Sequence, residues 1–244
     1  MDDFFSRSEA LLGAEVMEAL RTKRVILFGV GGVGSWCAES LIRTGLTHLT
    51  IVDGDTVQPS NVNRQLLATR ETVGRPKVEA LKERLLTINP EAEIVAIHKM
   101  YEPTPNPSLK GGGNNKSFPL GEDLGEALSS FNYVIDAIDD VAAKTDLILN
   151  ASRARGVKVF SSMGAALRLD PTQVTTGELM SIKGDALARA VRTRMKKLGV
   201  HPNKKIRCVY STEQAQRCET RGSLMQVTAV FGCTLASLII RDLL

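Results

Sequence analysis

Arg64, Lys77 and Asp139 are three side chains whose types and settings suit phosphate chemistry. Arg64 stands in the segment DGDTVQPSNVNRQ, Lys77 ends ETVGRPK, and Asp139 ends VIDAID. A guanidinium and an ammonium group can stabilise the negative charge that develops on a leaving pyrophosphate. An aspartate can hold Mg²⁺ against phosphate oxygens. We therefore take all three as candidate catalytic residues, and Asp139 as the candidate metal ligand.

A glycine-rich turn lies upstream of these residues. The apolar run RVILF leads into GVGGVGS and then into a segment that favours a helix. This order of strand, glycine turn and helix is typical of dinucleotide-binding units, because glycines let the backbone approach phosphate at a helix N-terminus. Asp53 follows 19 residues after the last glycine, where an acceptor for ribose hydroxyls belongs. The candidate phosphate-binding glycines are Gly29, Gly31, Gly32 and Gly34.

The polar cluster that begins at Asp53 favours ATP over a nicotinamide dinucleotide. Asp55, Asn61 and Gln65 join Arg64 as candidate cofactor-binding residues there, a density of polar side chains that a dinucleotide oxidoreductase does not need. Lys77 falls in the first turn of a predicted helix, so its ammonium and the free backbone N–H groups can act on one anion. ATP and Mg²⁺ are therefore the predicted cofactors. A nicotinamide-binding oxidoreductase and a non-catalytic nucleotide sensor remain alternatives.

Alternating apolar and amphipathic segments predict the elements that position these residues. The pattern indicates an α/β, Rossmann-like fold over a single domain of residues 1–244, with a mostly parallel sheet, helices on both faces and a smaller C-terminal portion made of a β-hairpin and a helix. Because parallel strands end at one edge of a sheet, Gly29, Asp53 and Asp139 should share one crevice. Strands are expected at 24–29, 48–53, 93–98, 132–139 and 157–164, helices at 9–22, 33–45, 75–89, 141–155 and 223–243, and a hairpin or extended pair at 167–179.

Three further segments bear on where the protein acts. Residues 101–122 hold four of the nine prolines and four glycines, which predicts a flexible surface insertion without chemistry. The N-terminal segment MDDFFSRSEA shows no signal peptide, and the apolar run 227–240 is short for a bilayer and indicates a buried helix. The four cysteines have no paired spacing. These features predict a cytoplasmic protein without a membrane partner.

The glycine turn, DGDTVQPSNVNRQ, VGRPK and VIDAID together resemble the adenylating domain of the ubiquitin-activating-enzyme-like family, over about residues 5–165. The resemblance implies that ATP is bound and that a carboxylate attacks its α-phosphate, giving an acyl adenylate and pyrophosphate. It also implies a homodimer, in which Arg7 of FSRSEALLG reaches the ATP of the partner subunit. By the same resemblance Asp53 binds the ribose, Asn61, Arg64 and Lys77 surround the phosphates, and Asp139 is associated with magnesium.

The second half resembles one branch of this family, the tRNA threonylcarbamoyladenosine dehydratases. The resemblance rests on 161–174, 185–200, 209–214 and 227–232. It implies activation of the threonylcarbamoyl carboxylate on an adenosine beside the anticodon, ring closure with loss of water, and release of AMP and pyrophosphate. The alternative is adenylation of the C-terminal carboxylate of a ubiquitin-like sulfur carrier. Those enzymes usually have two Cys-x-x-Cys zinc pairs, which this sequence lacks. A sulfur-transfer protein is a further partner that the family implies.

Residues 183–207 are strongly basic. They hold nine Lys or Arg residues against one acid, in a chain with a net charge of +4. Such a segment can contact a tRNA backbone, although a solvated helix face is the simpler alternative. Among the cysteines, Cys37 and Cys233 stand in apolar helical settings and are expected to be buried and inert. Cys218 stands in a late loop, and the sequence leaves its role open.

Overall fold

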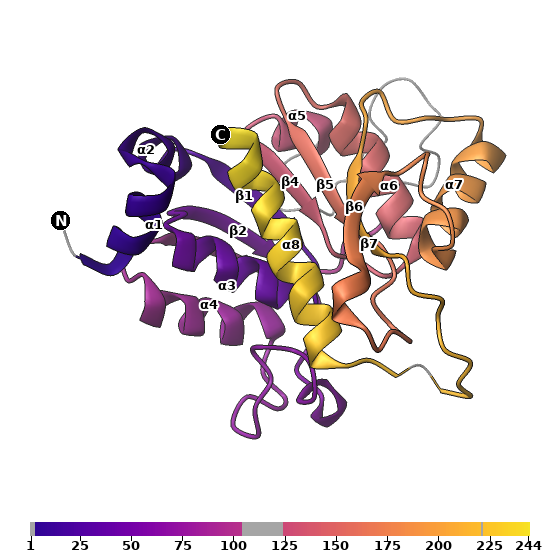
Figure 1. Ribbon diagram of the computed structural model, residues 1–244, viewed down its shortest axis with the longest axis horizontal. Helices are drawn as coiled ribbons and strands as arrows, with labels where there is room; N and C mark the ends of the chain where they lie inside the picture. Colours follow the sequence, from indigo (N-terminus) through magenta and orange to yellow (C-terminus); the bar gives the residue numbers. More distant parts are fainter. Residues whose placement is uncertain (1–2, 104–123, 221) are drawn as a thin grey trace.

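The computed structural model describes residues 3–103, 124–220 and 222–244, so most of the predicted insertion at 101–122 lies outside the described residues. Within these residues, seven strands form one sheet in the order β3-β2-β1-β4-β5-β7-β6 (Figure 1). All neighbouring strands pair in parallel except β6 and β7. The predicted mostly parallel, Rossmann-like sheet is confirmed. The strands are β1 (Arg24–Phe28), β2 (His48–Val52), β3 (Glu93–Ile97), β4 (Tyr133–Asp136), β5 (Lys158–Ser162), β6 (Val174–Glu178) and β7 (Arg207–Ser211).

Helices cover both faces of the sheet (Figure 1). The helices α3, α4 and α8 lie on one face, and α5, α6 and α7 lie on the other. β1 supplies both cores: Leu27 packs into one, while Ile26 and Phe28 pack into the other, as alternation along a strand requires. The helices are α1 (Ser6–Leu12), α2 (Ala14–Arg21), α3 (Gly34–Thr44), α4 (Lys77–Ile88), α5 (Leu124–Leu128), α6 (Val141–Arg153), α7 (Ala186–Leu198) and α8 (Met225–Leu243), with short 3₁₀ turns η1 (Asp3–Phe5), η2 (Pro59–Asn61) and η3 (Pro171–Gln173).

The last helix, α8, crosses the sheet beside α3 (Figure 1). By length and composition it could also cross a membrane, since the helix extends beyond the apolar run at 227–240. Here its buried side chains, Phe231 and Leu235 among them, belong to the core that it shares with α3. Gly232 makes this packing close, because a Cβ there would lie 2.5 Å from the Val33 carbonyl oxygen.

Two sequence predictions differ from the structure, and one strand was not predicted. The helix expected at 9–22 is two helices, because Gly13 has a φ of +83° and ends α1 before α2 begins. The hairpin expected at 167–179 is wrong: that segment supplies only η3 and β6. The partner of β6 is β7, which the sequence analysis missed, and the two pair antiparallel from Val174 opposite Ser211 to Glu178 opposite Arg207.

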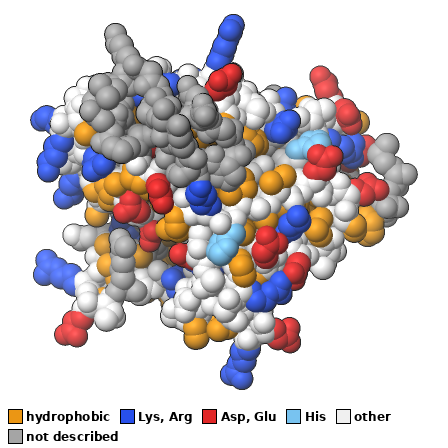
Figure 2. Space-filling model, turned by 180° about the vertical axis from the view of Figure 1, so that it is seen from behind, with side chains coloured by type: hydrophobic (Ala, Val, Ile, Leu, Met, Phe, Trp, Pro, Cys, Tyr) orange, Lys and Arg blue, Asp and Glu red, His pale blue; other side chains and the backbone are white. Residues whose placement is uncertain are grey.

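The basic segment at 183–207 forms α7 and the chain leading into β7. Figure 2 shows Lys and Arg side chains gathered at the left edge of the molecule, the side on which α7 lies in that view. One lysine of the basic segment makes hydrogen bonds within the protein: the ammonium of Lys204 donates to the carbonyl oxygens of Ala154 and Val157. Lys204 therefore holds the C-terminal end of α6, and its ammonium is not available to the predicted nucleic-acid surface.

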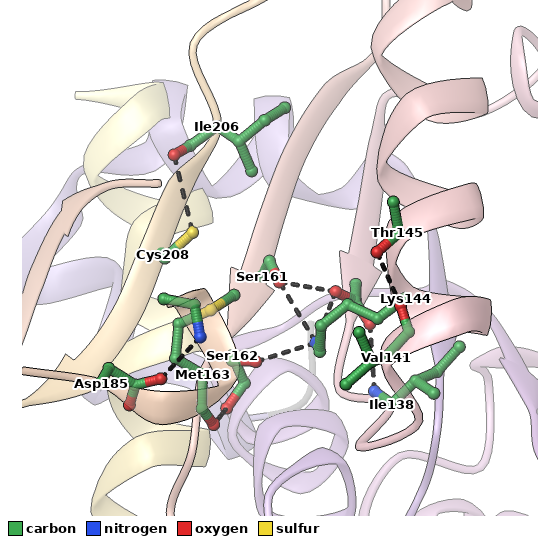
Figure 3. Close-up of polar contacts among 12 residues, drawn as sticks. Ile138, Val141, Lys144, Thr145, Ser161, Ser162, Met163, Asp185, Ile206 and Cys208 are labelled. Carbon is green, nitrogen blue, oxygen red and sulfur yellow. Dashed lines mark hydrogen bonds and ion pairs between the residues drawn. The ribbon is translucent and has the colours of Figure 1, made fainter. Parts of the chain in front are cut away.

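A buried ion pair joins the ends of β4 and β5 to α6 (Figure 3). The ammonium of Lys144 lies 2.6 Å from the Asp136 carboxylate, and both side chains are fully buried. Lys144 also donates to the carbonyl oxygen of Ser162, and the Ser161 hydroxyl donates to Asp136. The second oxygen of Asp136 accepts the backbone N–H of Ile138, so the pair also fixes the first residues of the β4–α6 loop.

We expect the change Lys144→Met to lower the free energy of unfolding by about 3–5 kcal/mol, because it leaves the Asp136 carboxylate buried without its cation. The matched control is Lys158→Met, which removes an ammonium that pairs with Asp242 but is 57% exposed. That change should cost less than about 1 kcal/mol. Urea unfolding of the two variants measures both values. An equal cost for the two substitutions would contradict the structural role of the buried pair.

Candidate functional site

A cleft of about 680 Å³ opens at the carboxyl ends of β1, β2, β4 and β5. The crevice predicted from the strand ends is therefore present, and Gly29, Asp53 and Asp139 all line it. Of the predicted site residues, the cleft is lined by Gly29, Gly31, Gly32, Asp53, Asp55, Asn61, Arg64, Gln65, Lys77 and Asp139. Gly34 and Arg7 are not among the lining residues.

The glycine turn brings backbone close to the cleft. Gly29 has a φ of +84°, and a Cβ on it would lie 2.8 Å from the carbonyl oxygen of Ala137. Gly34 begins α3, and a Cβ there would lie 1.8 Å from the Gly29 carbonyl oxygen. Because Gly34 has no side chain, the start of α3 packs directly against the Gly29 carbonyl oxygen. In the part of the chain that the structure describes, no side chain caps the start of α3, which suits the binding of an anion by its first-turn N–H groups.

Asp53 is held in place by two backbone N–H groups. Its carboxylate oxygens accept hydrogen bonds from Val30 at 2.8 Å and from Asp55 at 2.9 Å. Burial raises the pKa of Asp53 above its ordinary value of 3.8, while the nearby charge of Lys77 and the two hydrogen bonds act in the opposite direction. Each oxygen retains a further lone pair, so the fixed carboxylate can still accept hydroxyl groups of a ligand.

The buried Lys77 ammonium pairs with Asp55. Nζ lies 2.7 Å from Oδ2 of Asp55, and the backbone N–H of Lys77 donates to the Asp55 carbonyl oxygen. Lys77 lies in the first turn of its helix, as predicted, and is the first residue of α4; among the described residues no side chain caps that helix. Asp55, expected to bind the ligand directly, thus holds the lysine at the cleft wall. An incoming anion would compete with Asp55 for the ammonium.

Arg64 and Asn61 both make bonds within their own loop. The Arg64 guanidinium donates to the Ser60 carbonyl oxygen and to the side chain of Asn63, each at 2.9 Å. The side-chain oxygen of Asn61 accepts the backbone N–H of Gln58 and so caps η2. Asn61 therefore shapes the loop in this structure, whereas Arg64 needs only to exchange two neutral acceptors to bind a phosphate.

Gln65 has a buried polar atom with nothing to bind. Its Oε1 has no hydrogen-bond partner among the described residues, although the side chain lies in the cleft wall. An unpaired buried acceptor is costly and is usually satisfied by a ligand or an ordered water. A ligand that carries N–H or O–H donors therefore fits this wall.

Asp139 lies in the loop between β4 and α6, three residues beyond the end of the strand, and is exposed. The adjacent Asp140 has a different task, because its carboxylate accepts the N–H of Ala143 and caps α6. The described residues contain no group of three or more His, Cys, Asp or Glu side chains that could hold a metal ion. A metal ion at Asp139 would thus take its other oxygen ligands from phosphate and water.

Two parts of the wall were missed in the sequence. Tyr101, Glu102 and Pro103, the first residues of the predicted insertion at 101–122, line the cleft, whereas the prediction that the insertion carries no chemistry stays a prediction. The Tyr101 hydroxyl donates to Asp146 at 2.6 Å, and burial raises its pKa well above 10. Residues 101–103 follow β3, which ends at the same edge of the sheet as the other parallel strands. This position was the signal in the sequence that they could reach the cleft. The second missed part is the loop 162–166, after β5.

The loop after β5 is tied to the start of α7. The carboxylate of Asp185 accepts the N–H of Gly164 at 3.2 Å and that of Ala188 at 2.8 Å, so it caps α7 and holds the cleft wall at once. The buried Arg168 guanidinium lies 3.8 Å from the same carboxylate, and its Nε and Nη1 have no partner among the described residues. The start of α7 is therefore fixed relative to the cleft.

The four cysteines are free thiols, and the described cleft wall contains none of them. Cys37 is buried as expected, and burial raises its pKa above the usual range. The same expectation is wrong for Cys233, which lies on the outer face of α8 and is exposed. Cys218 is exposed.

Substituting two different glycines of the glycine turn, Gly34 and Gly31, should have unequal effects on stability. Gly34→Ala places a methyl group on the Gly29 carbonyl oxygen, so the backbone must shift, and we expect a loss of about 3 kcal/mol or more in unfolding free energy. Gly31→Ala is the matched control, because the nearest atom to its Cβ, Nε2 of Gln65, is 3.6 Å away. Its cost should stay below about 1 kcal/mol. Urea unfolding measures both, and similar losses would refute the packing argument.

Known proteins are similar to this chain along most of its length. The sequence is 37% identical over 209 residues to the tRNA threonylcarbamoyladenosine dehydratase of Bacillus subtilis, covering 86% of this chain and 74% of the relative. The crystal structure of E. coli tRNA N6-threonylcarbamoyladenosine dehydratase, TcdA, in complex with AMP matches with a TM-score of 0.85 and 31% identity, covering 99% of this chain and 94% of that one. A further structure of the same enzyme contains ATP.

A second kind of relative matches a smaller part of the chain. The molybdopterin-synthase adenylyltransferase of E. coli is 31% identical over 153 residues, which covers 63% of this chain and 53% of the relative. The model of the ThiF family matches residues 5–244, and the glycine turn, the cleft and the helix α8 all fall within that match. The chain belongs to the ThiF family.

Proposed function

We propose that this protein is an ATP-dependent tRNA threonylcarbamoyladenosine dehydratase. The observation that carries the proposal is the similarity to relatives of that name across nearly the whole chain, whereas the molybdopterin-synthase relative matches under two thirds of it. The cleft supports the same reaction, because its acidic, basic and glycine-turn residues suit a nucleoside triphosphate.

The chemistry requires that a carboxylate be converted into an electrophile. One oxygen of the threonylcarbamoyl carboxylate attacks the α-phosphate of ATP, and the bond to pyrophosphate breaks. A nucleophilic atom of the same threonylcarbamoyl group then attacks the activated carbonyl carbon, and AMP leaves with that carboxylate oxygen. The ring-forming step releases one proton, so the nucleoside loses the elements of water. An intramolecular nucleophile held close to the carbonyl makes an enzyme thiol unnecessary, which agrees with a described cleft wall that lacks cysteine.

The roles of the site residues follow from their positions. We propose that Asp53 accepts the ribose hydroxyls and that the glycine turn and the start of α3 face the phosphates. Lys77, released from Asp55, and Arg64 would stabilise the charge on the leaving pyrophosphate. Asp139 would hold Mg²⁺, whose charge offsets that of the phosphates.

The partners in this proposal are a tRNA and a second copy of the chain. Arg7 lies in α1, is exposed, and does not line the cleft of its own chain, which is consistent with action on the partner subunit's ATP. The four free thiols suit a reducing compartment, and we propose that the protein acts in the cytoplasm. A sulfur-transfer protein remains a further candidate partner.

The direct test is incubation with ATP, Mg²⁺ and threonylcarbamoyl-modified tRNA, followed by mass analysis of the nucleosides. The wild-type protein should remove one water from the modified nucleoside. Arg64→Ala, Lys77→Ala and Asp139→Asn should each lower the rate by about 100-fold or more, since each removes charge stabilisation in the transition state. Lys82→Ala is the matched control, because Lys82 lies further along α4 and does not line the cleft.

Other outcomes of this experiment separate the alternatives. Unchanged mass of the nucleoside with the wild-type protein would refute the proposal. Pyrophosphate exchange that depends on a small carrier protein would favour the sulfur-carrier alternative. Tight binding of NAD without binding of ATP would favour an oxidoreductase. A nucleotide sensor predicts ATP binding with no turnover for the wild-type protein.

The role of Arg7 has its own test. Neither Arg7→Ala nor Lys77→Ala protein should be active alone. If Arg7 serves the partner's site, mixed dimers contain one complete site, and equimolar mixing should restore about one quarter of the wild-type rate. Mixing each variant with more of itself is the control. If Arg7 acts within its own chain, or if the protein is a monomer, mixing restores nothing.

A further inference from the structure

A basic hollow lies beside the cleft, on the other side of the first turn of α7. Its volume is about 420 Å³. Val141 of α6, with Ala186 and Ala190 of α7, forms an apolar floor. Arg189, Arg194 and Lys197 of α7 supply its charged wall. Spacings of three, four and seven residues place Ala186, Ala190, Arg189 and Lys197 along one face of the helix.

The charge of this hollow is not neutralised. Between Ala186 and Leu198 the helix has five basic residues and no acidic residue. None of Arg189, Arg194 and Lys197 makes an ion pair with a described residue. Arg192 is used elsewhere, because its guanidinium donates to the Leu179 carbonyl oxygen at 2.8 Å. Four basic side chains of α7 therefore remain for an external anion, and the hollow gathers three of them, whereas the exposed Lys196 lies outside its lining.

The hollow and the cleft are adjacent, because residues at the starts of α6 and α7 contribute to both. Val141 in the hollow directly follows Asp139 and Asp140 of the cleft wall. Ala186 in the hollow precedes Leu187, which lines the cleft. The cap by Asp185 fixes this part of α7 to the loop after β5. A ligand that leaves the cleft on this side therefore enters a basic, partly apolar surface.

We propose that this hollow binds the RNA strand next to the adenosine whose threonylcarbamoyl group enters the cleft. This inference rests on the proposed function, and it identifies the surface of the protein that would hold the tRNA. Guanidinium and ammonium groups would contact phosphates, and an Arg plane or the apolar floor would pack against a base or a sugar. The size of the hollow suits a single unpaired strand, and unpaired loops are the usual targets of sequence-specific RNA recognition.

The test compares two triple variants that remove the same charge. The first is Arg189→Ala, Arg194→Ala and Lys197→Ala. The control is Lys23→Ala, Arg155→Ala and Arg241→Ala, whose residues lie near the start of β1, after α6 and near the end of α8, at the opposite edge of the sheet. The affinity for threonylcarbamoyl-modified tRNA is measured by fluorescence anisotropy over a range of salt concentrations, and ATP affinity is measured alongside it.

We expect the hollow variant to bind the tRNA at least about tenfold more weakly at moderate salt. The slope of log K against log salt should become shallower by about 2, since each lost phosphate contact on a single strand removes about 0.7. ATP affinity should stay at the wild-type value. The control variant should retain at least most of the tRNA affinity and the slope.

Each other result overturns the inference in a distinct way. Equal weakening by both triple variants would show that only total charge matters. Unchanged tRNA binding by the hollow variant, with a wild-type protein that dehydrates the nucleoside, would place the RNA elsewhere and leave the proposed function intact. A loss of carrier-protein-dependent pyrophosphate exchange in place of tRNA binding would make the occupant a protein. A wild-type protein that neither binds tRNA nor dehydrates it would refute the proposed function itself, and the hollow with it.

Discussion

The fully buried pair of Lys144 and Asp136 is the interaction on which the cleft wall depends. A charge at the carboxyl end of β4 and a charge in α6 are costly to bury, and hydrogen bonds with Ser161 and Ser162 compensate part of that cost. The ammonium holds the end of β5 through Ser162, and the carboxylate holds Ile138, one residue before Asp139. Both loops that flank the proposed phosphate site are therefore held by the same fully buried ion pair.

The site is preorganised, but several of its charges are occupied. Asp53 is fixed by two backbone N–H groups, whereas Lys77 and Arg64 bind acceptors of the protein itself. A polyphosphate would replace these acceptors with stronger ones, so the loop carrying Arg64 can change its bonds without a change of fold. Lys77 and Arg64 thus keep their positions through contacts that a polyphosphate can exchange.

Much of the fold could be predicted because it follows from local patterns. The strands β1 to β5 are short apolar runs before turn residues, and the glycine turn is recognisable from spacing alone. The pairing of β6 with β7 was not predictable in this way. The two strands are 29 residues apart, and α7 lies between them in the sequence. The capping of η2 by Asn61 and the pairing of Lys77 with Asp55 also depend on side-chain geometry, which residue types do not specify.

The contact between Gly232 and Val33 has a consequence for how the protein is made. Val33 belongs to the glycine turn near the start of the chain, and α8 presses against it with no side chain between the two backbones. Thr228 of the same helix lines the cleft. The glycine turn thus receives this backing from a helix that lies some 200 residues later along the chain. A nascent chain without α8 has the glycine turn but lacks the surface that packs against it.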